Sequence, residues 1–134
     1  MKLTIKEIGD ITGGQAVGDP SALVTGVSID SRSIDKNQLF VPIKAKRNGH
    51  DFVSDAIRNG ATGHLFSEGK AQGNAVKVND TLIALQDLAK FERKKITGDV
   101  IGITGSVGKT TTKDILFASL RNLTEVHVSK LSFN

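Results

Sequence analysis

A glycine-rich run late in the chain has the residue types that bind phosphate. Residues 102–112 read GITGSVGKTTT, and they lie between an apolar stretch at 100–104 and a helical pattern at 109–120. Backbone N–H groups in such a loop converge on phosphate oxygens, glycines allow close approach, and the N-terminus of the following helix favours negative charge. The sequence therefore predicts a nucleotide-binding loop between a strand and a helix.

Two residues of this loop have specific expected roles. Lys109 would reach the β and γ phosphates of ATP and the hydroxyl of Thr110 would bind Mg²⁺, so these two are the catalytic candidates and Thr110 is the candidate metal ligand. Ile103 stands where the common pattern G-x-x-x-x-G-K-[ST] has a glycine, so the match is to the shorter form Gly-x-x-Gly-Lys-Thr. The alternative interpretation is a glycine-rich turn with a surface lysine. The candidate cofactor-binding residues are Gly105, Ser106, Val107, Gly108, Lys109, Thr110 and Thr111.

The composition favours an anionic small molecule over nucleic acid as ligand. The 134 residues include 18 Lys and Arg against 14 Asp and Glu, which gives a formal net charge of +4 at pH 7. The absence of Trp and Tyr makes a stacking platform for bases hard to build. The sequence has no apolar run long enough to cross a membrane, and its start lacks the apolar segment of a signal peptide. We therefore expect a cytoplasmic monomer without nucleic-acid or membrane partners.

Hydrophobic periodicity and local capping signals predict an α/β fold. Thr4 and Glu7 have the spacing of a capping box for a first helix, which ends at Gly13. The apolar stretch at 39–43, the helix after it and the strand at 62–66 have the pattern of a βαβ unit. The other predicted helices cover residues 51–59, about 81–94 and 109–120, and the predicted strands cover 15–17, 23–29, 39–43, 62–66, 75–78, 100–104 and 125–128.

The same pattern predicts a domain boundary near residue 80. A polar segment at 67–74 and a short strand precede a helix start at 79–81, so we expect one domain over residues 1–80 and a second over 81–134. The second would contain a strand, the glycine run and a helix, whose apolar faces need further parallel strands to cover them. Residues 81–134 are therefore expected to be the beginning of an incomplete domain.

Several motifs along the chain resemble the Mur ligase family. Residues 104–113, TGSVGKTTTK, resemble the ATP loop of that family, whose short glycine spacing accounts for Ile103. The first domain resembles the family independently, in the order and spacing of Val27-Ser-Ile-Asp-Ser-Arg32, Leu39-Phe-Val41, Asn48-Gly-His50, Ala56 and Gly60-Ala61. The resemblance covers almost the whole chain and is greatest to the MurF type, which adds D-alanyl-D-alanine to UDP-N-acetylmuramoyl-tripeptide.

The resemblance implies a fold and an activity. A small N-terminal domain would bind the UDP end of the substrate, and the first P-loop β-α unit of a truncated central ATPase domain would follow it. In this family ATP phosphorylates the terminal carboxylate of the substrate, and the amine of D-alanyl-D-alanine attacks the acyl phosphate to form an amide and release ADP and phosphate. The implied cofactors are ATP and Mg²⁺, and the implied setting is peptidoglycan precursor synthesis for cell-wall biogenesis. Carried over by motif, the candidate substrate-binding residues are Ser31, Arg32, Lys46, Arg47 and Asn48.

These first-domain assignments have structural alternatives. The Asp30-Ser-Arg32 unit could be a turn whose side chains satisfy backbone N–H groups, and the basic cluster at 44–47 could be a solvated loop. His50 has the position of a helix-start or structural residue, and His64 and His127 lie in apolar strands with no second ligand at helical spacing. No metal site built from histidines is expected.

The length of the chain adds a further expectation. Because Mur ligases have a complete central domain and a third domain, we expect these 134 residues to be an N-terminal fragment, inactive as a ligase alone and weak in binding ATP. The competing interpretations are another Mur ligase that adds an amino acid (MurE-like), a folylpolyglutamate-synthetase-like protein, a noncatalytic nucleotide-sugar-binding module and, last, a nucleic-acid-binding protein.

Overall fold

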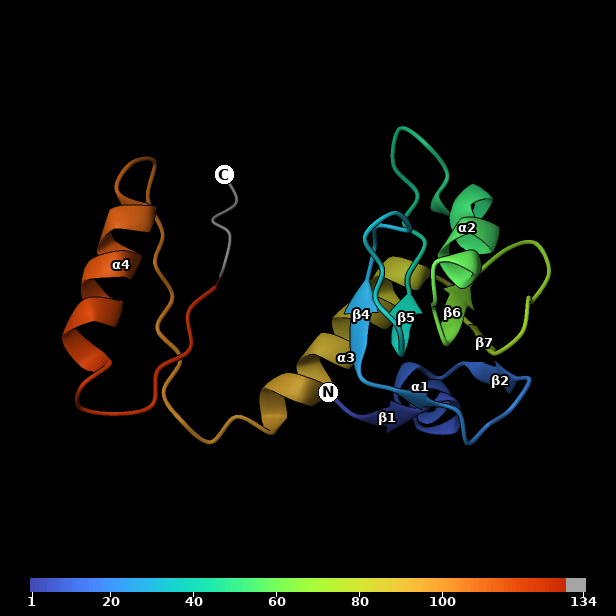
Figure 1. Ribbon diagram of the computed structural model, residues 1–134, viewed down its shortest axis with the longest axis horizontal. Helices are drawn as coiled ribbons and strands as arrows, with labels where there is room; N and C mark the ends of the chain where they lie inside the picture. The colour runs from blue at the N-terminus through green and yellow to red at the C-terminus, as the bar shows by residue number, and fades with distance from the viewer. Residues whose placement is uncertain (130–134) are drawn as a thin grey trace. The chain divides into compact units, whose positions relative to one another are not determined.

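The computed structural model describes residues 1–129, and the chain divides into two compact units, Met1–Thr97 and Gly98–Asn134. The first unit is built on a mixed five-stranded sheet with the strand order β2-β7-β6-β5-β4 (Figure 1). The strands β4 to β7 are parallel to their neighbours, and β2 pairs with β7 in the antiparallel direction. The strands are β2 (Gln15–Val17), β4 (Gly26–Ser28), β5 (Gln38–Phe40), β6 (Gly63–Phe66) and β7 (Ala75–Lys77).

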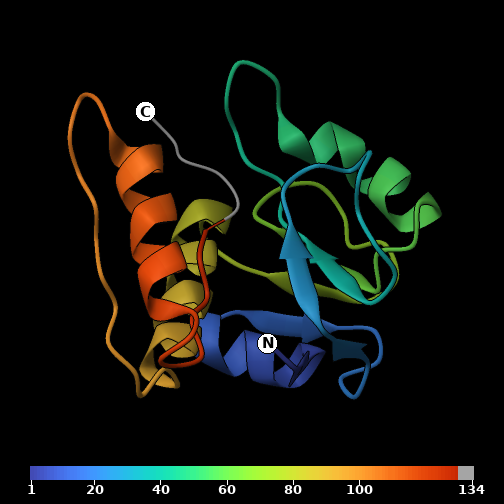
Figure 2. The same ribbon diagram turned by 60° about the vertical axis from the view of Figure 1, so that its left-hand side comes forward.

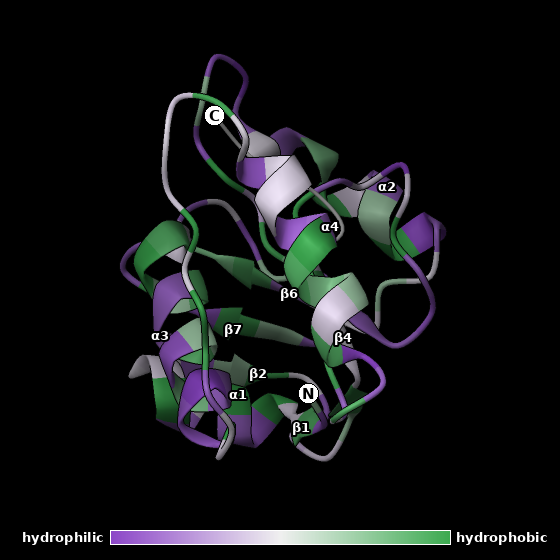
Figure 3. Ribbon diagram, turned by 90° about the vertical axis from the view of Figure 1, so that its left-hand side faces the viewer, coloured by the Kyte–Doolittle hydropathy of each residue, from purple (hydrophilic) through white to green (hydrophobic). Residues whose placement is uncertain are grey.

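Side-chain alternation in and after β5 gives the sheet two covered faces. Leu39 and Val41 pack in one buried cluster, whereas Phe40, which is 1% exposed, packs in a second with Ile34 and Val53. This is the period of two that an extended chain imposes. The helices α1 (Ile5–Thr12) and α3 (Thr81–Lys94) contribute to the first cluster and α2 (Val53–Arg58) to the second. In Figure 2 the strands lie between α2 and α1, and in Figure 3 β6 and β7 are largely green, the colour of hydrophobic residues.

The helix α1 forms where the capping box predicts it. The Thr4 side chain accepts a hydrogen bond from the backbone of Glu7, whose carboxylate accepts one from the Thr4 backbone, and Gly13 ends the helix with a φ of 63°. Two short strands, β1 (Leu3–Thr4) and β3 (Leu23–Val24), pair beside it. The single strand expected at 23–29 is therefore two strands in two different sheets, because the chain leaves β3 at Thr25 and enters the main sheet as β4.

The predicted βαβ unit is confirmed between β5 and β6. A short 3-10 helix, η1 (Gly49–Phe52), leads into α2, and the strands on either side are parallel. Pro42 lies two residues beyond the end of β5, so its missing N–H removes no hydrogen bond from this central strand. The connection places the chain after β5 and the chain after β6 at the same edge of the sheet.

The helix α3 packs in the first unit rather than in the second. Asp80 caps its N-terminus by accepting hydrogen bonds from two backbone N–H groups, and the Thr81 hydroxyl donates to the carbonyl of Pro42 at 2.5 Å. Ala84 and Leu88 are each 2% exposed in the cluster that also holds residues of α1. The division between the compact units thus follows this helix at Thr97, whereas the sequence-based boundary near residue 80 precedes it.

The described part of the second unit contains one helix, α4 (Lys109–Leu120), with the bounds expected from the sequence. Residues 100–104 and 125–128, both expected as strands, are in no strand, because a strand requires a hydrogen-bonded neighbour and neither has one among the described residues. No residue between 98 and 129 is buried. Over residues 1–129, no helix is long and apolar enough to cross a membrane.

Candidate functional site

The glycine run adopts a loop followed immediately by a helix. Gly108 is the N-cap of α4 with a φ of 82°, and Gly105 has a φ of 150°, both in the region that side chains rarely adopt. The first intrahelical bond runs from the Thr112 N–H to the Gly108 carbonyl at 2.9 Å. No side chain among residues 1–129 caps the N-terminus of the helix by a hydrogen bond, and the backbone N–H groups of a helix's first turn point out of its N-terminal end.

A shallow hollow of about 160 Å³ lies over this helix start. The Lys109 ammonium group folds back over the loop and donates to the carbonyl of Gly105. Val107, 88% exposed, has no packing role that would hold it in the loop. Backbone N–H groups, a helix N-terminus and an ammonium group around one hollow form an arrangement that can bind a phosphate group. Its lining residues are Ser106, Val107, Gly108, Lys109, Thr110 and Thr111, all of them predicted cofactor-binding residues.

A second candidate region lies at the carboxyl edge of the parallel strands in the first unit. Four connections leave this edge, after β4, β5, β6 and β7, because parallel strands all end on the same side. In α/β folds, ligands bind in the crevice outside the carboxyl ends of the strands. All five predicted substrate-binding residues are in the first two of these loops, so the fold brings their loops to one edge.

In the loop after β4, Asp30 fixes the guanidinium group of Arg32. Arg32 donates from Nε to Oδ1 at 2.9 Å and from Nη2 to Oδ2 at 2.7 Å, and its backbone N–H also donates to Oδ1. These bonds hold the pKa of the Asp30 carboxyl well below its usual value, at about 2. Ser31 is 7% exposed, and its carbonyl accepts a hydrogen bond from the Asn59 side chain. The turn considered as the structural alternative is therefore present, and its arginine faces solvent already paired with a carboxylate.

The loop after β5 forms a closed turn that we call the basic hairpin, residues 43–49. Lys44 and Asn48 face each other in an antiparallel bridge, and the Gly49 N–H donates to the Ile43 carbonyl at 3.0 Å. A side chain at Gly49 would lie 2.5 Å from the backbone nitrogen of Ile43, so only glycine fits there without a backbone shift.

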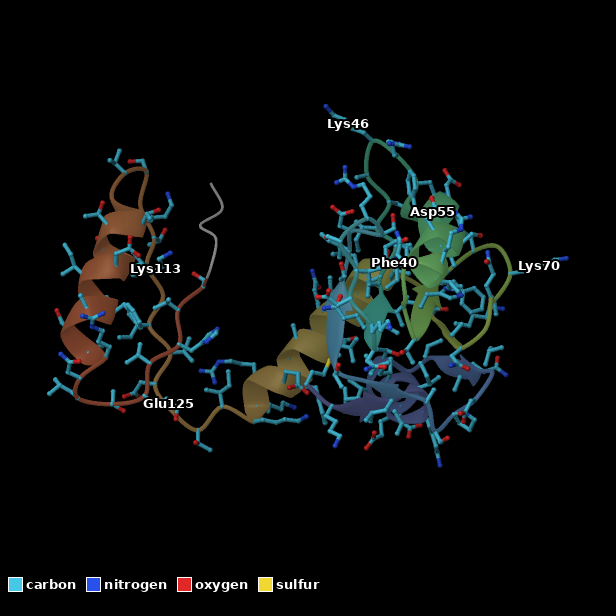
Figure 4. The ribbon with its side chains drawn as sticks, viewed as in Figure 1. Phe40, Lys46, Asp55, Lys70, Lys113 and Glu125 are labelled. Atoms are coloured by element: carbon cyan, nitrogen blue, oxygen red, sulfur yellow. The ribbon has the colours of Figure 1, made fainter. Side chains whose placement is uncertain are left out.

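The three cations of the basic hairpin have different surroundings. Lys44 forms an ion pair with Glu68 at 2.6 Å, and the Arg47 guanidinium lies 4.5 Å from the centre of the Phe52 ring. Lys46, at the tip, is exposed and has no charged partner in the described part of the chain (Figure 4).

A hollow of about 330 Å³ lies between η1, β6 and the loop after β6, and two histidines line it. The Nε2 atom of His50 accepts a hydrogen bond from the backbone N–H of Ser67 at 3.2 Å, and Nε2 of His64 accepts one from that of Gln72 at 3.1 Å. Burial is the main cause that lowers the pKa of both histidines. Both are therefore neutral near pH 7 and tie two points of the loop after β6 to the body of the unit.

Two features of this region have no sequence signal. Glu68 contacts Lys44 and Asn48, and Gln72 lies beside the ring of His64, although both follow β6 in a polar stretch without a motif. The predicted substrate residue Asn48 is the N-cap of η1, and its side chain accepts a hydrogen bond from the His50 backbone. Among residues 1–129, no group of three or more acidic, histidine or cysteine side chains could hold a metal ion.

Known proteins match this chain over most of its length. The UDP-N-acetylmuramoyl-tripeptide–D-alanyl-D-alanine ligase of Bacillus subtilis is 38% identical, with 100% of this chain and 31% of that protein covered. A crystal structure of MurF from Acinetobacter baumannii superposes with a TM-score of 0.82 at 28% identity, over 93% of this chain and 28% of that one. MurF from Thermotoga maritima in complex with ADP superposes with a TM-score of 0.64 at 34% identity, over 75% and 24%. The chain thus spans about a third or less of each of these proteins.

The family match covers the carboxyl-edge region. The sequence pattern described as "Mur ligase family, catalytic domain" matches residues 23–93, more than half of the chain. The match includes the Asp30–Arg32 turn, the basic hairpin and both lining histidines, and it ends before the glycine run. On this evidence the chain belongs to the Mur ligase family.

Proposed function

We propose that the chain is the N-terminal part of an ATP-dependent ligase that adds D-alanyl-D-alanine to UDP-N-acetylmuramoyl-tripeptide during peptidoglycan precursor synthesis. The observation that carries this proposal is the 38% identity, over the whole chain, to the Bacillus subtilis ligase of that name. Because the chain spans 31% of that relative, we propose the ligase activity for a longer protein, of about the relative's length, that contains this chain. We expect the 134 residues alone to be inactive as a ligase.

In this proposal the glycine run binds the phosphates of ATP. The N–H groups at the start of α4 and the Lys109 ammonium group would stabilise phosphate oxygens, with the hydroxyl of Thr110 as a ligand of the bound Mg²⁺. ATP supplies the phosphoryl group that activates the substrate carboxylate. Lys109 would exchange its bond to the Gly105 carbonyl for one to phosphate, an ionised acceptor that gives a stronger hydrogen bond. The Thermotoga maritima structure with ADP supports an adenine nucleotide as ligand.

The carboxyl edge of the first unit would bind the UDP part of the sugar nucleotide. Ser31 and Arg32 in the loop after β4, and Lys46, Arg47 and Asn48 in the basic hairpin, are the proposed contacts. Lys46 is the best placed of these for phosphate, because Arg32 and Arg47 already have partners and Asn48 caps η1.

A nuclear magnetic resonance titration tests both sites in the same chain. We expect Mg²⁺-ATP to shift the backbone amide signals of residues 105–111 in the wild type and not in Lys109→Ala, while a control variant, Lys94→Ala on α3, behaves as the wild type. UDP-N-acetylmuramoyl-tripeptide should shift signals in the Asp30–Arg32 turn and the basic hairpin instead. ATP shifts of equal size in Lys109→Ala would remove the nucleotide assignment. Absence of shifts at the carboxyl edge with the sugar nucleotide would remove the substrate assignment.

A further inference from the structure

One carboxylate joins the basic hairpin to the neighbouring loop. Glu68 follows β6, and its Oε2 accepts a hydrogen bond from Lys44 Nζ at 2.6 Å while its Oε1 accepts one from Asn48 Nδ2. Lys44 and Asn48 are the two bridge residues that close the hairpin. Glu68 therefore binds both stems of the hairpin at once.

The position of Glu68 is itself fixed from the other side. His50, two residues after Asn48, accepts a hydrogen bond at its Nε2 from the backbone N–H of Ser67, the residue directly before Glu68. The remaining polar atom of the Asn48 amide, Oδ1, accepts from the His50 backbone and lies 2.9 Å from His50 Nδ1. The groups facing Glu68 are thus the Lys44 ammonium, the Asn48 amide and the His50 ring, 3.8 Å away.

These contacts determine which cation the hairpin presents. Lys44 is neutralised by Glu68, and Arg47 is held over the Phe52 ring. Lys46 extends from the tip, away from the sheet (Figure 4). A hairpin held in this geometry binds an anion at a lower cost in conformational entropy than one that is ordered only on binding.

We propose that Glu68 is a positioning residue, which holds the basic hairpin so that Lys46 meets the diphosphate of the UDP-sugar. The inference rests on the proposed function for its ligand. The contact between Glu68 and the hairpin is independent of any ligand.

Because Glu68 is charged, a positioning role and a purely electrostatic role predict opposite changes in UDP affinity when it is replaced. Replacing it by glutamine removes a negative charge near a phosphate site, and through-space electrostatics alone would then strengthen the binding of UDP. Loss of the positioning contact would instead weaken the binding of UDP. In the glutamine variant an NH₂ group replaces one of the two carboxylate oxygens, so it faces a hydrogen-bond donor and cannot accept a hydrogen bond from it. A general loss of the folded structure would weaken the binding of UDP and of uridine to the same extent.

The experiment compares the wild type with Glu68→Gln and with Asp87→Asn, which removes an ion-paired carboxylate of the same unit on α3. The affinities for UDP and uridine and the hydrogen exchange of the hairpin amides are measured for each. We expect Glu68→Gln to bind UDP roughly two- to fivefold more weakly, with uridine unchanged. The amides of Ala45 and Gly49, which are bonded within the hairpin, should exchange faster. Asp87→Asn should match the wild type in both measurements.

Three results would overturn the inference. These are UDP binding that is unchanged or tighter in Glu68→Gln, a parallel loss of uridine binding, and unchanged exchange at both hairpin amides. If the wild type binds neither UDP nor uridine, the substrate assignment of the proposed function fails, and the exchange measurement still decides whether Glu68 holds the hairpin.

Discussion

Replacement of Gly49 by alanine should destabilise the first unit, because the added methyl group would overlap the backbone at the base of the basic hairpin. The added methyl group would lie 2.5 Å from the Ile43 nitrogen, 2.8 Å from the Ile43 oxygen and 2.9 Å from the Pro42 carbonyl carbon. All three are backbone atoms, so no side-chain rotation relieves the contact. Overpacking of this kind costs about 1–3 kcal/mol. The shift would also lengthen the 3.0 Å bond from the Gly49 N–H to Ile43, which contributes about 1 kcal/mol.

The sum, about 2–4 kcal/mol, is a large part of the stability of a unit of this size. It corresponds to a melting temperature lowered by roughly 10–20 °C. Because the chain has no Trp or Tyr, unfolding is best followed by far-ultraviolet circular dichroism. Gly26→Ala is the matched control, since its methyl group meets only the flexible Gln38 side chain at 3.3 Å, and it should change stability by less than about 1 kcal/mol. Equal melting of Gly49→Ala and the wild type would refute the steric argument.

Other predictions concern charge, pH and the core. Arg32→Gln should raise the carboxyl pKa of Asp30 from about 2 towards its ordinary value near 3.9, as measured by a carbon-detected titration, although the backbone N–H of residue 32 remains as a donor. A pKa still near 2 would mean that the Arg32 side chain is not the main cause. Burial lowers the pKa of His64, so the unfolded chain binds more protons between that lowered pKa and about 6.5, and the free energy of unfolding should fall as the pH drops through this window. Urea titrations of His64→Gln should show a flatter pH dependence than the wild type, and an equal slope would contradict this origin. Phe40→Ala should cost about 3–5 kcal/mol because Phe40 is the largest side chain of its small cluster, whereas a loss below 1 kcal/mol would mean that the cluster rearranges to fill the space.

Local signals predicted the helices better than the strands. The capping box at Thr4, the Asp80 cap and the pattern at 109–120 gave the positions of α1, α3 and α4, because a helix makes its hydrogen bonds and its caps within a few residues. A strand depends on a partner from elsewhere in the chain. The prediction of a single strand at residues 23–29 was wrong for this reason. Nothing in the local sequence indicates that the two halves of this apolar stretch pair with different strands.

The candidate sites divide in the same way. The glycine run is contiguous in sequence, so its loop and helix could be located from the residues alone. The carboxyl edge is assembled from loops far apart in the sequence. The parallel pairs β4–β5 and β5–β6 bring the Asp30 turn and the basic hairpin to it, and the sequence did not predict this pairing of β4 with β5. Glu68 could not be predicted, because it contacts Lys44 and Asn48 over 24 and 20 residues and belongs to no motif.

The antiparallel pairing of β2 with β7 has a consequence for biosynthesis. The parallel pairs β4–β5, β5–β6 and β6–β7 each join consecutive strands, so they can form in the order in which a ribosome makes them. The first helix contacts its chain neighbours β1 and β2, but it also packs against β7 and α3, which are made later. Ile5 and Ile8 lie in a cluster that includes Leu88, and β2 must wait for β7. The N-terminal segment is therefore synthesised first, but its packing and strand pairing are completed only after β7 and α3 have been made. A nascent chain halted before α3 should expose the apolar face of α1 to chaperones, whereas one that includes α3 should hide it.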